Sequence, residues 1–339
     1  MRVQIVYLSA RPALLGETLG HLRHFAPFID NAVVIAPRRL ESQMSAIGEP
    51  WALPVTVVTD EELIDSPMSL DHAARNQQLR AAVASHAAVA DVFVMSDDDA
   101  RPIIDIDESI FITADGRHRR RYFHALADWR HNVTDFDKSL LHSWIALRQR
   151  GLPDPLCYAS HMPQVIDKAL YAEVTSSLQS VAERYPIDEW SPYFNLAPVQ
   201  HPDRFAEPEA FVTLGWPQYP GEWAHQVTPP QHVFENHHPE LHESGALYDG
   251  LPTACDPDTA ADTNLEKIVR WYRLERQVRA LDFPEDVDQP WTSDSPSRKL
   301  AFKGLKAARS AYRYVSLDER ARIAELEGRI RSLEHRTES

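Results

Sequence analysis

Cysteine is scarce in this sequence, and long apolar runs are absent. The 339 residues include only two cysteines, Cys157 and Cys255, about a hundred positions apart. Two cysteines at this distance exclude a disulfide framework and a cysteine metal site, and they are typical of a reducing compartment. No stretch approaches the roughly 18 apolar residues of a membrane-spanning helix, and the first residues lack a signal-peptide pattern. These absences predict a cytoplasmic protein.

Positive charge is also in deficit. The 35 lysines and arginines are outnumbered by 50 acidic residues, which gives a formal net charge of −15. Binding to nucleic acid needs a basic surface, so we expect no nucleic-acid partner. The chain has no internal repeat and no Gly-x-Gly-x-x-Gly turn after its first predicted strand, which excludes a dinucleotide-binding domain of that type. The 43% of hydrophobic and 25% of charged residues are ordinary for a globular protein.

Strand and helix patterns alternate along the first hundred residues. Apolar runs typical of strands occupy residues 3–8, 31–37, 55–60 and 92–96, and helical periodicity occupies residues 14–27 and 69–89. This alternation predicts an α/β fold with a mostly parallel sheet flanked by helices. Ligands of such folds bind beyond the carboxyl ends of the strands. Polar residues that directly follow a strand are therefore candidate site residues.

Three carboxylates in a row, Asp97, Asp98 and Asp99, follow the apolar run at 92–95. Adjacent carboxylates repel one another unless a cation or hydrogen-bond donors lie among them. An Asp-x-Asp pair at a strand end can present two carboxylates to Mn²⁺ or Mg²⁺, and such an ion can carry a diphosphate. A solvated acidic loop is the alternative. A phosphatase of the Asp-x-Asp-Gly-Thr type is excluded, because Ala100 and Arg101 follow the triplet.

The order of three short motifs resembles the nucleotide-binding half of GT-A-type glycosyltransferases. "IVYLSARP" opens the chain, and "HAARNQQLRAAV" precedes "VFVMSDDD". The resemblance implies that Asp97 and Asp99 flank the metal ion and the donor sugar. It also implies donor-binding roles for five residues: Ser9 and Arg11 beside the nucleotide, Asp60 at its base or ribose, and Arg75 and Asn76 at its diphosphate. For the last two, an exposed helix face is the alternative.

Two motifs in the second half of the sequence contain candidate catalytic residues. "YASHMPQVIDKALYAEV" resembles a block of the Stealth-type sugar-phosphate transferases and makes His161 an acceptor-side candidate, with a packed helix-capping histidine as the alternative. "YPIDEWSPYFNLA" holds Asp188 and Glu189 about ninety residues after the triplet, where inverting GT-A enzymes carry the base that deprotonates the acceptor. We favour Glu189, because sugars stack well on an indole such as that of Trp190. A carboxylate at a helix start is the alternative.

Histidines are dense in residues 232–250. Many GT-A enzymes supply a late histidine as a metal ligand, and the resemblance makes His237 and His238 the candidates. His242 lies four residues beyond His238. A zinc site is a rival interpretation, since neutral imidazole suits zinc, although no cysteine spacing accompanies it. Acceptor binding and loop packing remain open as well.

The remaining segments predict the domain organisation. We expect helices over 137–151, 166–186 and 261–281, a basic loop over 115–123, long ordered loops over 187–260, and a linker over 282–297. These segments divide the chain into a nucleotide-sugar-binding half (1–105), an acceptor-binding half (106–255) and C-terminal helices (256–339).

The C-terminal tail combines basic and heptad patterns. Residues 297–314 carry six lysines and arginines among apolar residues, which is typical of a helix that lies on an anionic membrane. A helix packed on the protein's own acidic surface is the alternative. Further on, residues with 3-4-3 spacing predict a short coiled coil and hence a homo-oligomer: Ile323, Leu326, Ile330 and Leu333. We therefore expect peripheral contact with the inner face of the membrane.

Together these patterns predict a metal-dependent enzyme that uses Mn²⁺ or Mg²⁺. It would move a sugar, of the hexose type, from a nucleotide-diphosphate sugar to a glycan or lipid-linked acceptor of cell-wall polysaccharide. A Stealth-type transferase of sugar 1-phosphate and a non-catalytic scaffold that binds nucleotide-sugar are the alternatives.

Overall fold

The protein is seen here as a computed structural model. It describes residues 3–279 except 66, 68–69, 71, 129–134, 160, 215–231 and 254–258. The predicted linker, the basic segment and the coiled-coil residues lie outside the described residues. No helix in the part that is described has both the length and the hydropathy needed to cross a membrane.

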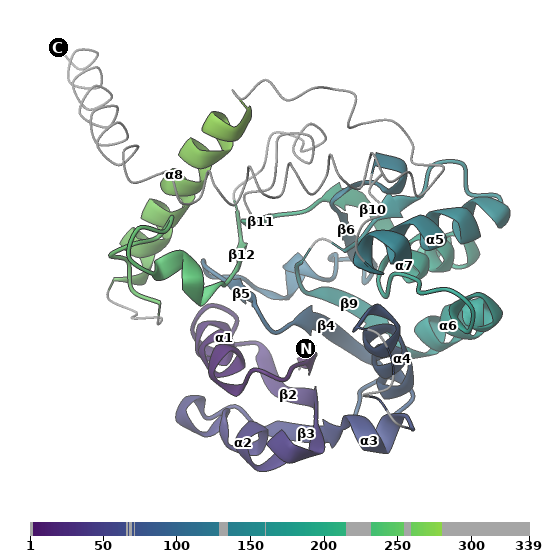
Figure 1. The fold of residues 1–339 in the computed structure, drawn as a ribbon, viewed down its shortest axis with the longest axis horizontal. Helices are drawn as coiled ribbons and strands as arrows, with labels where there is room; N and C mark the ends of the chain where they lie inside the picture. Colours follow the sequence, from purple (N-terminus) through teal and green to yellow (C-terminus); the bar gives the residue numbers. More distant parts are fainter. Residues whose placement is uncertain are drawn as a thin grey trace. The chain divides into compact units, whose positions relative to one another are not determined.

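A five-stranded sheet forms the centre of the fold, in the order β3-β2-β1-β4-β9 (Figure 1). Its strands are β1 (Val3–Leu8), β2 (Ile29–Ala36), β3 (Val55–Thr59), β4 (Val92–Asp97) and β9 (Gln164–Asp167). The first four strands are parallel, and β9 runs antiparallel to β4. The prediction of an α/β fold with a mostly parallel sheet is confirmed.

Helices cover both faces of this sheet because side chains along a strand alternate between its faces. Ile5 and Tyr7 of β1 pack into one core with α1 (Pro12–Phe25) and α2 (Glu41–Ala46). Val6 faces the other core. That core also contains side chains from four helices: α4 (His72–Ala84), α5 (Asp135–Gln149), α6 (Lys168–Ala182) and α7 (Ser191–Gln200). The short helix α3 (Asp60–Leu63) follows β3 directly.

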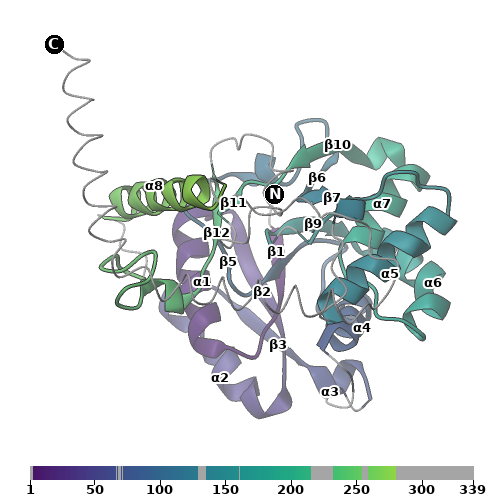
Figure 2. The same ribbon diagram turned by 45° about the horizontal axis from the view of Figure 1, so that its top comes forward.

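A second, smaller sheet continues from the acidic triplet. Strand β5 (Ala100–Pro102) pairs antiparallel with β12 (Phe234–Asn236), and β12 pairs with β11 (Thr213–Leu214). Helix α8 (Ala260–Arg279) lies beside β12 and β5 in both views (Figures 1 and 2). Residues far apart in the sequence thus come together next to Asp99.

Two predictions of secondary structure were wrong, and a third misplaced the bounds of a helix. The expected basic loop at 115–123 contains strand β6 (His118–Tyr122), which pairs with β10 (Phe205–Ala210), and its three arginines hide the strand pattern. The expected helix at 166–186 begins two residues later, because Ile166 and Asp167 belong to β9 and the Asp167 carboxylate caps α6. The expected loops at 187–260 contain α7 and three strands; α7 escaped notice because eight consecutive residues are buried, which leaves no apolar periodicity.

Two further short strands, β7 (His124–Ala125) and β8 (Leu156–Cys157), pair with each other, and β8 contacts Asn195 of α7. The domain boundaries at 105 and 255 stay predictions.

Candidate active site

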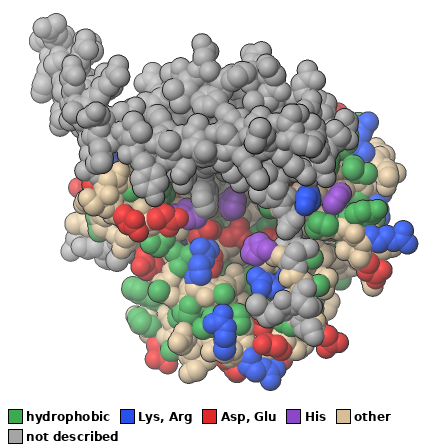
Figure 3. Space-filling view, viewed as in Figure 1, with side chains coloured by type: hydrophobic (Ala, Val, Ile, Leu, Met, Phe, Trp, Pro, Cys, Tyr) green, Lys and Arg blue, Asp and Glu red, His purple; other side chains and the backbone are tan. Residues whose placement is uncertain are grey.

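A cavity of about 620 Å³ opens at the carboxyl ends of the parallel strands. Acidic, basic and histidine side chains gather in the middle of the face of the molecule that Figure 3 shows. All the residues predicted to bind the donor or to act in catalysis line this cavity: Ser9, Arg11, Asp60, Arg75, Asn76, Asp97, Asp99, His161, Asp188 and Glu189. His237 and His238 are not among the lining residues.

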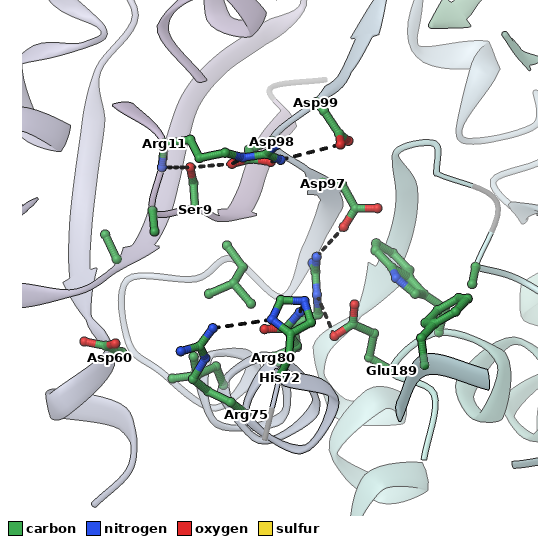
Figure 4. Close-up of a pocket in the computed structure, with 18 of the residues that line it drawn as sticks. Ser9, Arg11, Asp60, His72, Arg75, Arg80, Asp97, Asp98, Asp99 and Glu189 are labelled. Atoms are coloured by element: carbon green, nitrogen blue, oxygen red, sulfur yellow. Dashed lines mark hydrogen bonds and ion pairs between the residues drawn. The ribbon is translucent and has the colours of Figure 1, made fainter. Parts of the chain in front are cut away.

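The three carboxylates of the acidic triplet make two different kinds of contact. The middle carboxylate, Asp98, accepts a hydrogen bond of 2.6 Å from the Ser9 hydroxyl and ion pairs with both Nε and Nη2 of Arg11 (Figure 4). The Ser9 hydroxyl in turn accepts the backbone N–H of Arg11 at 3.0 Å. Ser9 and Arg11 therefore neutralise and orient the triplet while they border the cavity. The repulsion expected among three adjacent carboxylates is offset at Asp98 by the guanidinium of Arg11.

The outer two carboxylates converge with an imidazole. Ligand atoms of Asp97, Asp99 and His161 all lie within 4.8 Å of one another. Burial and the negative charge of Asp97 raise the pKa of Asp99 to about 6. Nδ1 of His161 has no hydrogen-bond partner among the described residues and lies 3.6 Å from Oδ2 of Asp97. Two carboxylate oxygens and one imidazole nitrogen fit a divalent cation, although Arg80 pairs with Asp97 and Arg11 lies 3.5 Å from Asp99. His161, predicted on the acceptor side, thus lies on the metal side.

The two late histidines differ in position. Nε2 of His238 lies 3.9 Å from Oδ2 of Asp99, so His238 flanks the candidate metal group. Nε2 of His237 lies 2.8 Å from the carboxylate of Glu17, and its backbone N–H donates to the carbonyl oxygen of Asp99 in the triplet (2.6 Å). His242 lies in the segment 240–251, where its Nδ1 is 3.1 Å from the carbonyl oxygen of Leu251.

The sequence prediction missed Arg80, whose side chain is only 3% exposed. Its Nη2 donates to Oδ1 of Asp97 at 2.6 Å, and its Nε lies 3.2 Å from Oε2 of Glu189. Figure 4 shows Arg80 between these two carboxylates. The guanidinium also stacks on the indole of Trp190, 4.7 Å from the ring centroid. An arginine on the sheet-facing side of α4, next to the buried Leu79, was the available signal.

The candidate bases Asp188 and Glu189 are held differently. Burial raises the pKa of Glu189 to about 7, against the opposing effect of Arg80. The Asp188 carboxylate accepts the backbone N–H of Ser191, the first residue of α7, at 2.6 Å, while burial raises its pKa. Trp190 is only 5% exposed and packs on Arg80. Trp190 nevertheless lines the cavity, so the choice of Glu189 for its neighbouring indole stays a prediction, and Glu189 is the carboxylate less occupied by the backbone.

The predicted nucleotide side lies across the cavity. Asp60 is buried, its Oδ1 has no hydrogen-bond partner among the described residues, and burial together with Glu61 raises its pKa to about 6. A donor group, such as an N–H of a base or a ribose hydroxyl, would satisfy this oxygen. Arg75 and Asn76 lie near His72, at 3.4 and 3.2 Å from its two ring nitrogens. All three side chains line the cavity from α4.

Comparisons with known proteins give neighbours in structure only. No family model and no curated protein matches the sequence. Similar solved structures include mouse xyloside xylosyltransferase 1 in its apo form, with 10% identity, a TM-score of 0.44, and coverage of 69% of this chain and 97% of that chain. An active-site mutant of LgtC has 10% identity, a TM-score of 0.45, and coverage of 84% and 98%.

The galactosyltransferase LgtC, in complex with donor and acceptor sugar analogs, has 9% identity, a TM-score of 0.39, and coverage of 85% of this chain and 100% of its own. These neighbours carry the names of glycosyltransferases, the class that the sequence motifs resemble.

Proposed function

We propose that this protein is a metal-dependent glycosyltransferase that moves a sugar of the hexose type from a nucleotide-diphosphate sugar to a glycan or lipid-linked acceptor. The observation that carries the proposal is the convergence of Asp97, Asp99 and His161 in one cavity with Glu189. The opposite wall of this cavity carries an unsatisfied carboxylate oxygen, on Asp60, and a cation, Arg75. Acid groups for a metal, polar groups for a nucleotide and a candidate base are what such a transfer requires.

Each residue has a distinct part in this proposal. Asp97, Asp99 and His161 hold Mn²⁺ or Mg²⁺, which when bound offsets the negative charge of the departing diphosphate. Arg75 and Asn76 bind the diphosphate, and Asp60 accepts a hydrogen bond from the base or ribose. Glu189 takes the proton of the acceptor hydroxyl. Arg80 fixes the position of Glu189 relative to Asp97, since it pairs with both.

A stabilisation screen tests the proposal. Nucleotide-diphosphate sugars are added with and without Mn²⁺, and unfolding is followed by calorimetry. A ligand at 100 times its Kd should stabilise the protein by about 2.7 kcal/mol. We expect this gain for at least one donor, and only with the metal. No stabilisation by any donor, with or without Mn²⁺, would contradict the proposal.

One observation favours a second candidate, a Stealth-type transferase of sugar 1-phosphate. His161, which belongs to the motif resembling that family, reaches the cavity beside Asp97. In such an enzyme the acceptor hydroxyl attacks the donor's phosphorus, and a nucleoside monophosphate leaves. In a glycosyltransferase the acceptor attacks the sugar, and a nucleoside diphosphate leaves. Chromatography of the released nucleotide separates the two. Tight donor binding without any turnover would instead support the non-catalytic scaffold.

The tail is proposed to bring the enzyme to its acceptor. We expect a cytoplasmic protein that contacts the inner membrane face through the basic residues of 297–314, near the lipid-linked precursors of cell-wall polysaccharide, and that oligomerises through the heptads. Each Lys or Arg near an anionic surface contributes roughly 1 kcal/mol.

Deleting residues 298–339 should therefore abolish co-sedimentation with anionic vesicles and lower the mass in light scattering. Turnover of a soluble acceptor should survive, because no proposed site residue lies in the deleted segment. Truncated protein that still pellets with vesicles would rule out this anchor, and an unchanged mass would rule out the coiled coil.

A further inference from the structure

Helix α8 packs through an unusual buried face. Its buried positions Ala260, Asn264, Lys267 and Trp271 follow a 4-3-4 spacing. Such a stripe on a helix is normally apolar, but here its two middle members are polar. Asn264 Nδ2 donates to the carbonyl oxygen of Ile103, just after β5. The helix is thus fixed to the smaller sheet by specific polar contacts as well as by apolar packing.

Lys267 belongs to a fully buried ionic cluster. Its Nζ donates to Oε1 of Glu235 at 2.9 Å, and Nε of Arg101 donates to the same oxygen at 2.8 Å. The three side chains are 1%, 2% and 0% exposed, respectively. Burying such charges costs more than packing apolar groups of the same size. The cluster therefore contributes little to the stability of the fold, and its position points to another role.

The cluster extends to the acidic triplet along two routes. In the first, Nη1 of Arg101 lies 3.6 Å from Glu17, whose Oε2 lies 2.8 Å from Nε2 of His237. His237 donates its backbone N–H to the carbonyl oxygen of Asp99 at 2.6 Å. The second route is the strand itself, because Glu235 pairs with Arg101 in the register of β12 and β5.

The end of β12 contacts a candidate metal ligand with side chains too. Nδ2 of Asn236 lies 3.5 Å from Oδ1 of Asp99, and Nε2 of His238 lies 3.9 Å from its Oδ2. Both carboxylate oxygens of Asp99 thus face groups carried by segment 236–238. A shift of this segment would change where Asp99 points.

We propose that Lys267 is a positioning residue of the candidate metal site, acting through Glu235 on segment 236–238 and hence on Asp99. The inference rests on the proposed function, because it takes Asp99 as a metal ligand. Lys267 does not line the cavity, so its effect on the site is indirect. Its attraction to Glu235 is strong where water is excluded. Lys267 also adds a second cation to the Arg101–Glu235 pair, and its removal leaves that pair balanced.

The test is a titration of the full-length chain with Mn²⁺ alone. Groups that hold metal ligands in place account for about 10–100-fold in metal affinity. We expect Lys267→Met to weaken the Kd for Mn²⁺ about tenfold by calorimetry. The matched control is Arg270→Met, which makes the same change of charge on the same helix and breaks the pair with Glu266 instead. Its Kd should stay within twofold of the parent.

A second readout separates positioning from general loosening. At saturating Mn²⁺, the electron paramagnetic resonance spectrum of the bound ion should change in Lys267→Met and stay parental in Arg270→Met. Should Lys267→Met fail to fold, Glu17→Gln replaces it. The Glu17 side chain is 36% exposed, and its change breaks the first route, so the same tenfold loss is expected.

Parental Mn²⁺ affinity and spectrum in the folded variant would overturn the inference and leave the proposed function intact. A parent protein that binds no Mn²⁺ would overturn both.

Discussion

Replacing Glu189 with glutamine is expected to lower turnover by about 10²–10⁴-fold, the usual contribution of a positioned general base, and to leave donor affinity unchanged. The Glu189 carboxylate lies at the cavity beside Arg80, which ties it to Asp97. Glutamine keeps the shape of the side chain but cannot accept a proton. Steady-state kinetics with a fixed acceptor, together with donor binding by calorimetry, measure the two quantities separately.

The pH dependence gives a second test of this role. Because burial raises the pKa of Glu189 to about 7, the base is protonated and inactive at lower pH. The parent's kcat/KM should therefore fall as the pH drops through about 7, and the remaining activity of Glu189→Gln should lack this limb. The contribution of Glu189 to the free energy of unfolding changes with pH in the opposite direction to the activity. A carboxyl whose folded pKa exceeds its ordinary 4.5 favours folding most below pH 4.5, and this contribution is lost as the pH rises through 7.

Asp188→Asn is the matched comparison. Asparagine keeps an oxygen that can accept the backbone N–H of Ser191 at the start of α7, so stability should change little. The acidic limb should persist. If Glu189→Gln keeps full turnover, the base is Asp188, or the reaction retains configuration and needs no such base.

Replacing Asp99 with asparagine should abolish Mn²⁺-dependent donor binding without loss of stability. Asp99 is one of three groups that converge on the candidate metal position, and Asp97 and burial already raise its pKa to about 6. Removing its charge removes a metal ligand and relieves repulsion from Asp97. We therefore expect the metal-free variant to unfold at the parental temperature or above it. The stabilisation of about 2.7 kcal/mol at 100 times the Kd should disappear.

Asp98→Asn provides the opposite pattern one residue away. Asp98 pairs with Arg11 and accepts the Ser9 hydroxyl, and hydrogen bonds to charged groups contribute about 1.5–3 kcal/mol each. This variant should lose stability, while a folded fraction still binds Mn²⁺ through Asp97 and Asp99. Unchanged Mn²⁺-dependent donor affinity in Asp99→Asn would show that the metal site has been placed wrongly.

The sequence alone determined the four parallel strands of the central sheet and the location of the candidate site. Strands β1 to β4 are short apolar runs buried between two layers of helices, and such runs are recognisable without knowledge of their neighbours. Because parallel strands end at one edge, the polar residues after them had to meet there. The acidic triplet was found for this reason, whereas Ser9 and Asp60 were implied by the resemblance to GT-A-type glycosyltransferases.

Only the tertiary structure decided which of these residues contact one another. Arg80 bridges Asp97 and Glu189, which are ninety-two positions apart in sequence, and Asp98 turns away from the metal group to meet Arg11. Which side chains pair depends on the distances between elements in the folded protein. These distances cannot be read from the local sequence. Helix α7 and strand β6 were missed for a related reason. The first is buried on every side and the second carries arginines whose partners come from distant segments, so neither shows the periodicity of a half-exposed element.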